Sequence, residues 1–296
     1  RKSFPLFPAE RSFMHRLTVT SYRLASPKLS APLSIALVSD LHGTCFGPRQ
    51  EILLDTVRRE EPDLVLLCGD ILDPAVSPKG SLILLKALSA SYPCFFVSGN
   101  HEEWTRQMPR LRNGLSRLGV RPLRGETISE IIAGQRIELG GVDDPHAFTL
   151  SHHSLRLSKK WVRQLVRCER QRNPEHFSIL LSHRPELVTY YADTGFDLIT
   201  CGHAHGGQIR LPFCPGGLFA PHQGFFPRYA GGLYRLGDAR LAVSRGLCIN
   251  RLPRIGNPPE LVVIHAQPEA AGMPDASPQA CSRLTGKHRQ NAQNQA

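Results

Sequence analysis

The sequence predicts a mixed α/β fold in which a buried β-sheet is covered by helices. Three features indicate this fold: short runs that are apolar throughout, amphipathic segments between them, and a change to shorter alternating segments in the second half. The 296 residues are 41% hydrophobic, which is enough for one large domain or two small ones.

In the first half of the chain, three strands alternate with three helices. The expected strands are 34–39, 64–68 and 94–98, and the expected helices are 48–60, 81–90 and 104–118. Pro48 lies near the start of the first helix, where a proline is tolerated because the amide hydrogen there is not needed. Apolar residues on both faces of each strand are typical of a sheet that is buried on both sides.

The second half has shorter elements. Gly125 and the Ala133-Gly134 pair divide residues 120–142, which predicts antiparallel hairpins. The remaining expected elements are a helix at 158–172, strands at 177–182 and 196–200, a Gly/Pro/Phe-rich loop at 206–232, and closing strands at 233–244 and 261–265. We therefore expect an N-terminal extension at residues 1–30, one domain at 31–266, and a disordered tail at 267–296.

Charge and cysteine content narrow the class of protein. The net charge of +11 favours phosphate-bearing partners such as nucleotides, nucleic acid or anionic lipid. None of the eight cysteines forms a CxxC pair, and Cys68, Cys94 and Cys201 lie in apolar runs, so we expect a reduced, cytoplasmic protein. No apolar run has the length of a membrane span, although a chain that begins with Arg1 leaves room for an anchor upstream.

Five polar clusters follow strand-like runs, where open α/β sheets place their sites. They are Asp40-Leu41-His42, Gly69-Asp70, Gly99-Asn100-His101-Glu102, His183, and Gly202-His203-Ala204-His205. Carboxylates and imidazoles together suit divalent Mn, Fe, Zn or Ni. One such cluster alone would more often be an ordinary loop. Five such clusters at successive strand ends are not explained by packing in a hydrophobic core, because buried polar groups without partners cost stability.

This order of motifs resembles the calcineurin-like metallophosphoesterase family, and the resemblance covers Ile35 to Ile264. It implies a double β-sandwich flanked by helices and a site for two divalent ions. The implied ligands of the first ion are Asp40, His42 and His205, those of the second are Asn100, His183 and His203, and Asp70 bridges both. His101 would lie beside the scissile phosphate, as a general acid or a stabiliser of charge. Glu102 stands where the family often has Asp, and we expect it to support the ligands from behind.

Later stretches resemble the YaeI/YkuE branch of that family. They are residues 206–212, 220–229, 244–247 and 257–260. Within the branch, the chain looks similar to UDP-2,3-diacylglucosamine pyrophosphatases of the LpxG type. This resemblance implies cleavage of a pyrophosphate to lipid X and UMP in lipid A biosynthesis, with manganese as the expected metal. The alternative is a broad-specificity phosphodiesterase that acts on a small or nucleotide substrate.

Two surfaces fit a lipid-linked anionic substrate. Five basic residues share one face of the expected helix at 158–172 and its approach: Arg156, Lys160, Arg163, Arg167 and Arg170. They form either a solvated face or a patch that rests on the inner face of the cytoplasmic membrane, while Leu157, Trp161, Leu165 and Cys168 line the apolar side. The loop aromatics Phe213, Phe219, Phe225 and Phe226 are either a packed cover or an apolar lip for acyl chains.

Other polar residues are weaker candidates. Arg245, Arg251 and Arg254 either contact substrate phosphates or are surface charges, and His146, His152 and His153 are expected to be exposed. Asp143 and Asp144 precede a proline and are expected in a turn. We do not expect nucleic acid as a partner, because the basic residues are not interleaved with a stacking platform. A non-catalytic scaffold is disfavoured since every metal-ligand position is intact.

Overall fold

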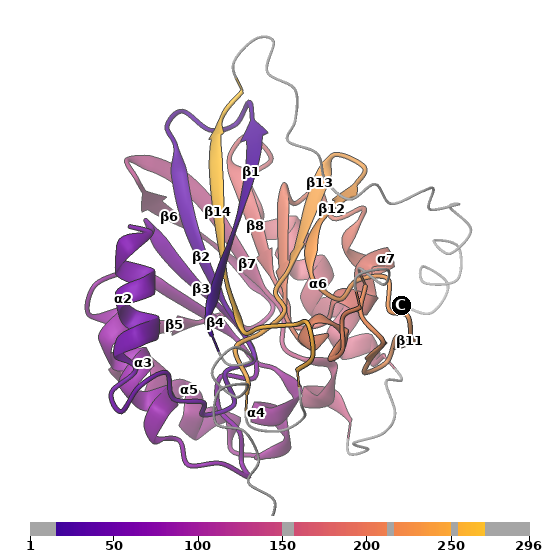
Figure 1. The fold of residues 1–296 in the computed structure, drawn as a ribbon. Coiled ribbons are helices and arrows are strands. Elements are labelled where there is room, and N and C mark those ends of the chain that lie inside the picture. The colour runs from indigo at the N-terminus through magenta and orange to yellow at the C-terminus, as the bar shows by residue number, and fades with distance from the viewer. Residues whose placement is uncertain (1–15, 150–156, 212–215, 250–253, 270–296) are drawn as a thin grey trace, which may run out of the picture.

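The computed structural model describes residues 16–149, 157–211, 216–249 and 254–269. Two six-stranded sheets pack face to face, and helices cover the outer face of each sheet (Figure 1). The predicted α/β architecture, with a double sandwich flanked by helices, is therefore confirmed.

The first sheet has the strand order β1-β14-β2-β3-β4-β5. Its strands are β1 (Thr18–Ser26), β14 (Glu260–Pro268), β2 (Leu33–Val38), β3 (Leu64–Cys68), β4 (Cys94–Val97) and β5 (Val120–Pro122). All neighbours are parallel except β14 and β2, which are antiparallel. The carboxyl ends of β2, β3 and β4 consequently meet at one edge, which brings their following loops together.

The second sheet has the order β12-β13-β9-β8-β7-β6. Its strands are β12 (Gly232–Leu236), β13 (Ala239–Val243), β9 (Leu198–Cys201), β8 (Phe177–Leu181), β7 (Gln135–Gly141) and β6 (Glu126–Ile132). The four central strands are parallel, and a hairpin closes each edge. The loops after β8 and β9 therefore also meet at one edge of the sheet.

Alternation along the strands explains why the sheets stack. Ile35 and Leu37 of β2 point into the core between the sheets, together with Ile179 of β8. Ala36 and Val38 point the other way and pack under the helices. Each central strand is thus buried on both faces, as its continuous apolar sequence predicts.

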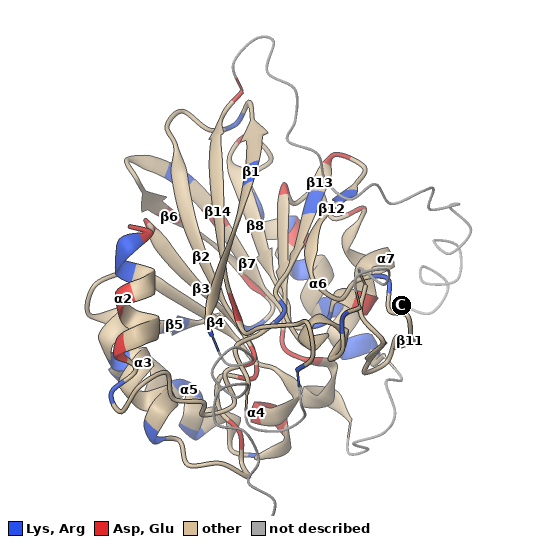
Figure 2. Ribbon diagram, in the orientation of Figure 1, with Lys and Arg blue, Asp and Glu red and all other residues tan. Residues whose placement is uncertain are grey.

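Helices cover both outer faces. The first sheet carries α2 (Glu51–Arg59), α3 (Lys79–Ser89) and α5 (Met108–Arg117), and the second carries α6 (Lys159–Gln171) and α7 (Val188–Tyr191). The short helix α4 (Asn100–Trp104) lies at the carboxyl end of β4. Short 3-10 helices are η1 (Pro145–Phe148), η2 (Pro185–Leu187) and η3 (His205–Gly207). Charged residues lie largely on helices and loops, whereas the central strands are almost free of them (Figure 2). Among the described residues, no helix combines the length and apolarity needed to cross a membrane.

Several boundaries differ from the sequence prediction. The predicted extension at 1–30 contains β1, which pairs with β14 over nine positions and so belongs to the sheet. The single helix expected at 104–118 is two helices, because Arg106 has a left-handed backbone and Pro109 is confined to the first turn of α5. Residues 120–122 form parallel β5 instead of a hairpin, whereas the β6–β7 hairpin is confirmed. Residues 1–15 and 270–296 lie outside the described part of the chain.

The loop expected at 206–232 also holds regular structure. It contains η3 and a two-stranded hairpin of β10 (Phe219–Ala220) and β11 (Gly224–Phe225). The cysteines expected in the core, Cys68, Cys94 and Cys201, are buried, and none of the three is in a disulfide.

Candidate metal centre

The polar clusters that follow the strands converge in a single site. Asp40, Asp70 and Asn100 come from loops of the first sheet, and the His183 and His203 loops come from the second. Two glycines permit this approach. A Cβ on Gly99 would lie 2.2 Å from Asp70 Oδ1, and one on Gly202 would lie 2.4 Å from Asp40 Oδ2. These positions therefore accept only glycine.

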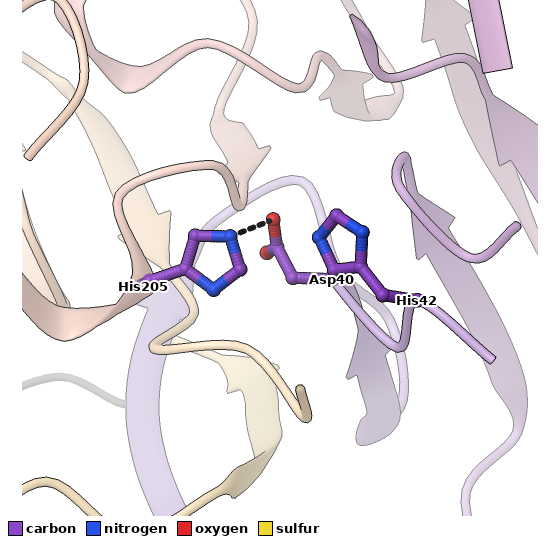
Figure 3. Close-up of side chains that lie close together, drawn as sticks. All are labelled: Asp40, His42 and His205. Atoms are coloured by element: carbon purple, nitrogen blue, oxygen red, sulfur yellow. Dashed lines mark ion pairs between the residues drawn. The ribbon is translucent and has the colours of Figure 1, made fainter. Parts of the chain in front are cut away.

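The first ligand group is Asp40, His42 and His205 (Figure 3). His205 Nε2 lies 3.6 Å from Asp40 Oδ1, and the His42 and His205 rings are stacked with centroids 5.3 Å apart. His42 Nδ1 lies 3.0 Å from Asp73 Oδ2. A proton on Nδ1 that is donated to Asp73 leaves the Nε2 lone pair to face the group, as metal-binding histidines require.

The second ligand group is Asp70, His183 and His203. His183 Nε2 lies 3.2 Å from Asp70 Oδ2, while its Nδ1 lies 2.8 Å from the carbonyl oxygen of Cys68. That carbonyl can only accept a hydrogen bond, so Nδ1 carries the proton and Nε2 is available to a cation. His203 Nδ1 lies 3.2 Å from His183 Nε2, which directs both rings to one point.

Buried polar atoms show that the groups suit cations. Within the described part of the chain, Asn100 Oδ1 and His42 Nε2 are buried and have no hydrogen-bond partner. Such atoms are costly unless something else satisfies them. Asp70 also groups with His42 and His101, so it lies where both ligand groups meet. Six of the seven predicted ligands thus fall into adjoining groups that are linked through His42 and Asp70, and the partnerless Asn100 Oδ1 follows β4 in the same region, so the residues suit two divalent ions.

The electrostatics of the group favour a positive occupant. Burial raises the pKa of Asp40, and Asp70 adds to that effect against the opposing charge of His183. Burial alone would also raise the pKa of Asp70, but His183 and His101 hold it well below its usual value. Burial disfavours the charged form of His183, yet Asp70 raises its pKa to about 10. In the metal-free protein, a proton on His183 thus supplies positive charge that a metal ion would replace.

The pKa values of His203 and His205 are lowered, in contrast to that of His183. Burial lowers the pKa of each well below the usual value, reinforced by the charge of Arg184 on His203 and of His42 on His205. Both imidazoles are consequently neutral at physiological pH, which is the form that binds a metal.

His101 lies beside the ligand groups. Its Nε2 is 4.0 Å from Asp70 Oδ2, and its Nδ1 is 3.3 Å from Asp73 Oδ2. The ring packs on Trp104 with centroids 4.2 Å apart and meets His42 edge-on at 4.5 Å. These contacts fix the imidazole at the site, where it can donate a proton to a bound phosphate ester.

Glu102 supports the ligand loops through the backbone. Its carboxylate accepts hydrogen bonds from the amides of Asp70 (2.8 Å), Leu72 (2.9 Å) and Gly99 (2.9 Å). Burial and the charge of Asp70 raise its pKa to about 7 despite these bonds. Glu102 thus joins the loops after β3 and β4, which is the supporting position expected from the sequence.

Asp73 is a site residue that the sequence prediction missed. Its Oδ2 contacts both His42 and His101, so one carboxylate orients a ligand and the proposed proton donor together. Burial would raise the pKa of Asp73, but hydrogen bonds with His42 and the Ala75 amide, together with the charges of His101 and His42, lower it to about 2. The signal was present, because Asp73 follows Asp70 by three residues in the same loop.

The prediction that His146 is exposed was wrong. His146 is buried, with its Nδ1 2.9 Å from Asp144 Oδ1 and 2.9 Å from Arg184 Nη2. The fully buried Arg184 pairs with Asp144 and places Nη1 2.7 Å from His203 Nε2 and from His222 Nδ1. The predicted turn residue Asp144 is thus part of a buried ion pair, which the local sequence could not show because Arg184 is 40 residues away.

The predicted arginines serve the scaffold in this structure. Arg245 pairs with Glu260 at 2.7 Å, and Arg254 donates to the carbonyl oxygens of Cys248, Asn257 and Arg245. Their role in substrate binding stays a prediction. Four further predicted residues lie outside the described part of the chain: His152, His153, Arg156 and Arg251, and so does Phe213.

The sequence that forms this site matches a known protein family. Residues 33–207 match the family model of the calcineurin-like phosphoesterases. The chain is 29% identical over 271 residues to the uncharacterized metallophosphoesterase YkuE of Bacillus subtilis, covering 84% of this chain and 85% of that protein. It is 27% identical over 227 residues to phosphodiesterase YaeI of Escherichia coli, covering 74% and 76%.

The relatives differ in how much of their length this chain spans. An uncharacterized metallophosphoesterase of Campylobacter jejuni is 29% identical over 252 residues. The match covers 83% of this chain but only 62% of that longer protein. The crystal structure of TT1561 from Thermus thermophilus shares the fold, with a TM-score of 0.50 at 12% identity over 73% of this chain and 90% of that one.

Proposed function

The chain belongs to the calcineurin-like phosphoesterase family, and from that premise we propose that it is a two-metal phosphohydrolase. The predicted class of metal-dependent hydrolase is confirmed at the level of the family. The observation that carries the proposal is Asp70, which lies where two ligand groups meet, with His101 beside it. One carboxylate can offer an oxygen to each of two cations, which is the arrangement that phosphate cleavage by two metal ions requires.

The predicted ligands form two sets that share Asp70. Asp40, His42 and His205 would hold one ion, and Asn100, His183 and His203 the other, with Asp70 shared. Bound divalent cations supply positive charge for the phosphate and make water a stronger nucleophile. The donor set of imidazole, carboxylate and amide suits manganese, and iron, zinc or nickel would also fit.

His101 supplies the proton chemistry in this proposal. Its Nδ1 faces Asp73, so its Nε2 is the atom that can protonate the departing oxygen of an ester or a pyrophosphate. Packing on Trp104 keeps the ring from rotating away. The buried surroundings strengthen each of these interactions, because few waters compete there.

For the substrate, we propose the pyrophosphate of UDP-2,3-diacylglucosamine, cleaved to lipid X and UMP. The support is the similarity of the sequence as a whole to LpxG-type enzymes, together with the exposed aromatic residues Phe219 and Phe225 of the β10–β11 hairpin, whose turn residue His222 contacts His203. A second candidate is a broad phosphodiesterase that acts on a small or nucleotide substrate. The relative named phosphodiesterase YaeI favours that reading.

A parallel hydrolysis assay tests these proposals. Purified protein with added Mn²⁺ would be incubated with UDP-2,3-diacylglucosamine in detergent and, separately, with a soluble aryl phosphodiester. Release of UMP and lipid X at a rate well above the aryl rate supports the lipid-linked substrate. Cleavage of the aryl ester alone supports the broad phosphodiesterase. Absence of hydrolysis of both, with metal bound, overturns the proposed function.

A further inference from the structure

An exposed apolar surface lies on the segment that follows the last metal-ligand motif. It consists of Leu211, Phe219, Phe225, Phe226 and Ile255, which we call the apolar rim. The exposed fractions are 70% for Phe225, 68% for Phe226 and 43% for Phe219. Large aromatic side chains that are this exposed and this close in sequence are a feature of interaction surfaces.

Backbone hydrogen bonds hold the rim together. Phe219 pairs with Phe225 across the β10–β11 hairpin, and their rings meet edge to face with centroids 5.5 Å apart. The amide of Phe226 donates to the carbonyl of Leu218, and the amide of Leu218 donates to that of Ile209, which bridges to Ile255. The rim is therefore a built surface that belongs to one connected piece of backbone.

The same hairpin reaches the metal centre. His222 lies in the turn between β10 and β11, with its Nδ1 3.3 Å from His203 Nε2 and 2.7 Å from Arg184 Nη1. The amide of Leu218 also donates to Gly207, next to the His205 loop. A surface that binds the rim is thus brought close to His203 and to the His205 loop.

The charge of this region selects the kind of partner. Between residues 198 and 259 the sequence has a single acidic residue, Asp238. The same stretch has seven arginines: Arg210, Arg228, Arg235, Arg240, Arg245, Arg251 and Arg254. Arg228 is exposed and follows Phe226 by two residues. Arg245 and Arg254 are engaged within the fold, so the positive charge next to the rim is carried by the exposed Arg228 in a stretch that is almost free of acidic residues. Exposed aromatic side chains next to such charge complement a surface that is apolar inside and anionic outside.

From these observations we propose that the apolar rim inserts into the surface of an anionic phospholipid bilayer and seats the metal centre there. Helix α6 is a poorer candidate, although it carries the basic face noted in the sequence. Its large apolar residues Trp161, Leu165 and Cys168 are buried against the second sheet, and no large apolar side chain of α6 is exposed enough to insert. The proposed substrate explains why such docking is useful, but binding itself does not depend on turnover.

Vesicle sedimentation tests the proposal. The wild-type chain would be spun with vesicles of phosphatidylglycerol and phosphatidylcholine, and with vesicles of phosphatidylcholine alone. We expect binding to the anionic vesicles, and at least about a tenfold loss of binding in the Phe225→Ser/Phe226→Ser variant, because two exposed aromatic groups no longer enter the lipid. Ile131→Ser is the matched control. Ile131 is 66% exposed on β6, at the edge of the second sheet farthest from β12, and its loss should leave binding unchanged.

Three outcomes would overturn the proposal. Lack of wild-type binding to anionic vesicles would exclude a lipid partner, and equal binding by the double variant would assign binding to charge alone. A wild-type dimer that the double variant converts to a monomer, without vesicles, would show that a second copy covers the rim. Hydrolysis of a soluble aryl phosphodiester by the double variant reports an intact site. Failure of that activity in the wild type would count against the proposed function and leave the vesicle result standing.

Discussion

At the scale of single residues, the backbone of the site is held in an unusual conformation. Five of the predicted ligands have a left-handed backbone with φ between 46° and 65°: Asp40, His42, Asp70, His203 and His205. Each such non-glycine residue costs about 1–2 kcal/mol relative to the right-handed region. The strained backbone is kept because the surrounding loops fix its conformation. Glu102 contributes to this by accepting hydrogen bonds from the amides of Asp70 and Gly99. The local strain thus lies at the residues that would hold the cations.

Two substitutions at this scale separate metal binding from proton transfer. We expect Asp70→Ala to abolish turnover and lose metal, because the shared carboxylate is removed. We expect His101→Ala to lower kcat by about 10²–10⁴ while metal content is retained, because only the proton donor is lost. Metal analysis and circular dichroism would accompany the rate measurements, and both variants should stay folded. A wild-type rate in either variant would contradict the assignment.

Asp73 provides a third test. Its Oδ2 contacts both His42 and His101 while its Oδ1 accepts from the Ala75 amide, and a neutral amide has only one oxygen to accept with. Asp73→Asn should therefore lower metal affinity by about 10–100-fold and also reduce kcat at saturating metal. Manganese titration followed by calorimetry measures the first effect. Asp55→Asn, at an exposed position on α2, is the matched control and should bind metal like the wild type.

At the scale of elements, the sequence predicted most of the central strands but misjudged some boundaries. Continuous apolar runs locate β2, β3, β4, β8 and β9, because both faces of these strands are buried. Strand β1 escaped detection since its residues alternate between exposed and half-buried, and only pairing with β14, over 240 residues away, orders it. The break between α4 and α5 depends on Arg106, whose left-handed backbone no periodicity reveals.

Helix α4 gives a prediction on pH dependence. Burial, reinforced by Asp143 and Asp144, raises the pKa of Glu103 to about 8 despite a hydrogen bond from Ser98 and the charge of Arg112. The folded protein therefore binds this proton more tightly than the unfolded chain. Unfolding releases it between about pH 4.5 and 8, so the free energy of unfolding falls as pH rises through that window.

Glu103→Gln should remove this part of the pH dependence. In metal-free protein, the free energy of unfolding should fall less between pH 5.5 and 8 in the variant than in the wild type. The difference should be about 1 kcal/mol or more, because glutamine does not titrate. Guanidinium unfolding at both pH values measures the difference. An unchanged slope of stability against pH would show that Glu103 does not hold its proton in the fold.

At the scale of the whole molecule, the site joins the two sheets. Asp40, Asp70 and Asn100 follow strands of the first sheet, whereas His183 and the His203 loop follow strands of the second. The motif order in the sequence placed every ligand at a strand end, and the family resemblance grouped them. Neither showed Arg184 or His222 beside His203, because these contacts depend on how the sheets and the β10–β11 hairpin pack.

Because the ligands come from both sheets, metal removal should weaken the whole fold. Without cations, the buried carboxylates of Asp40 and Asp70 face each other with only imidazolium charge between them. Ions at about 100 times their dissociation constant contribute roughly 2.7 kcal/mol, and for a domain of this size that corresponds to about 5–10 °C in Tm. Thermal unfolding with chelator, and again after Mn²⁺ is restored, measures the shift.

A matched variant separates this effect from general salt effects on the protein. Asp40→Asn removes one buried charge and one ligand, so its metal-free form should unfold at a temperature no lower than that of the wild type. It should also gain less than the wild type when Mn²⁺ is added, since one ion loses its carboxylate. Equal Tm values for the wild type with and without Mn²⁺ would show that the cations do not bridge the two sheets energetically.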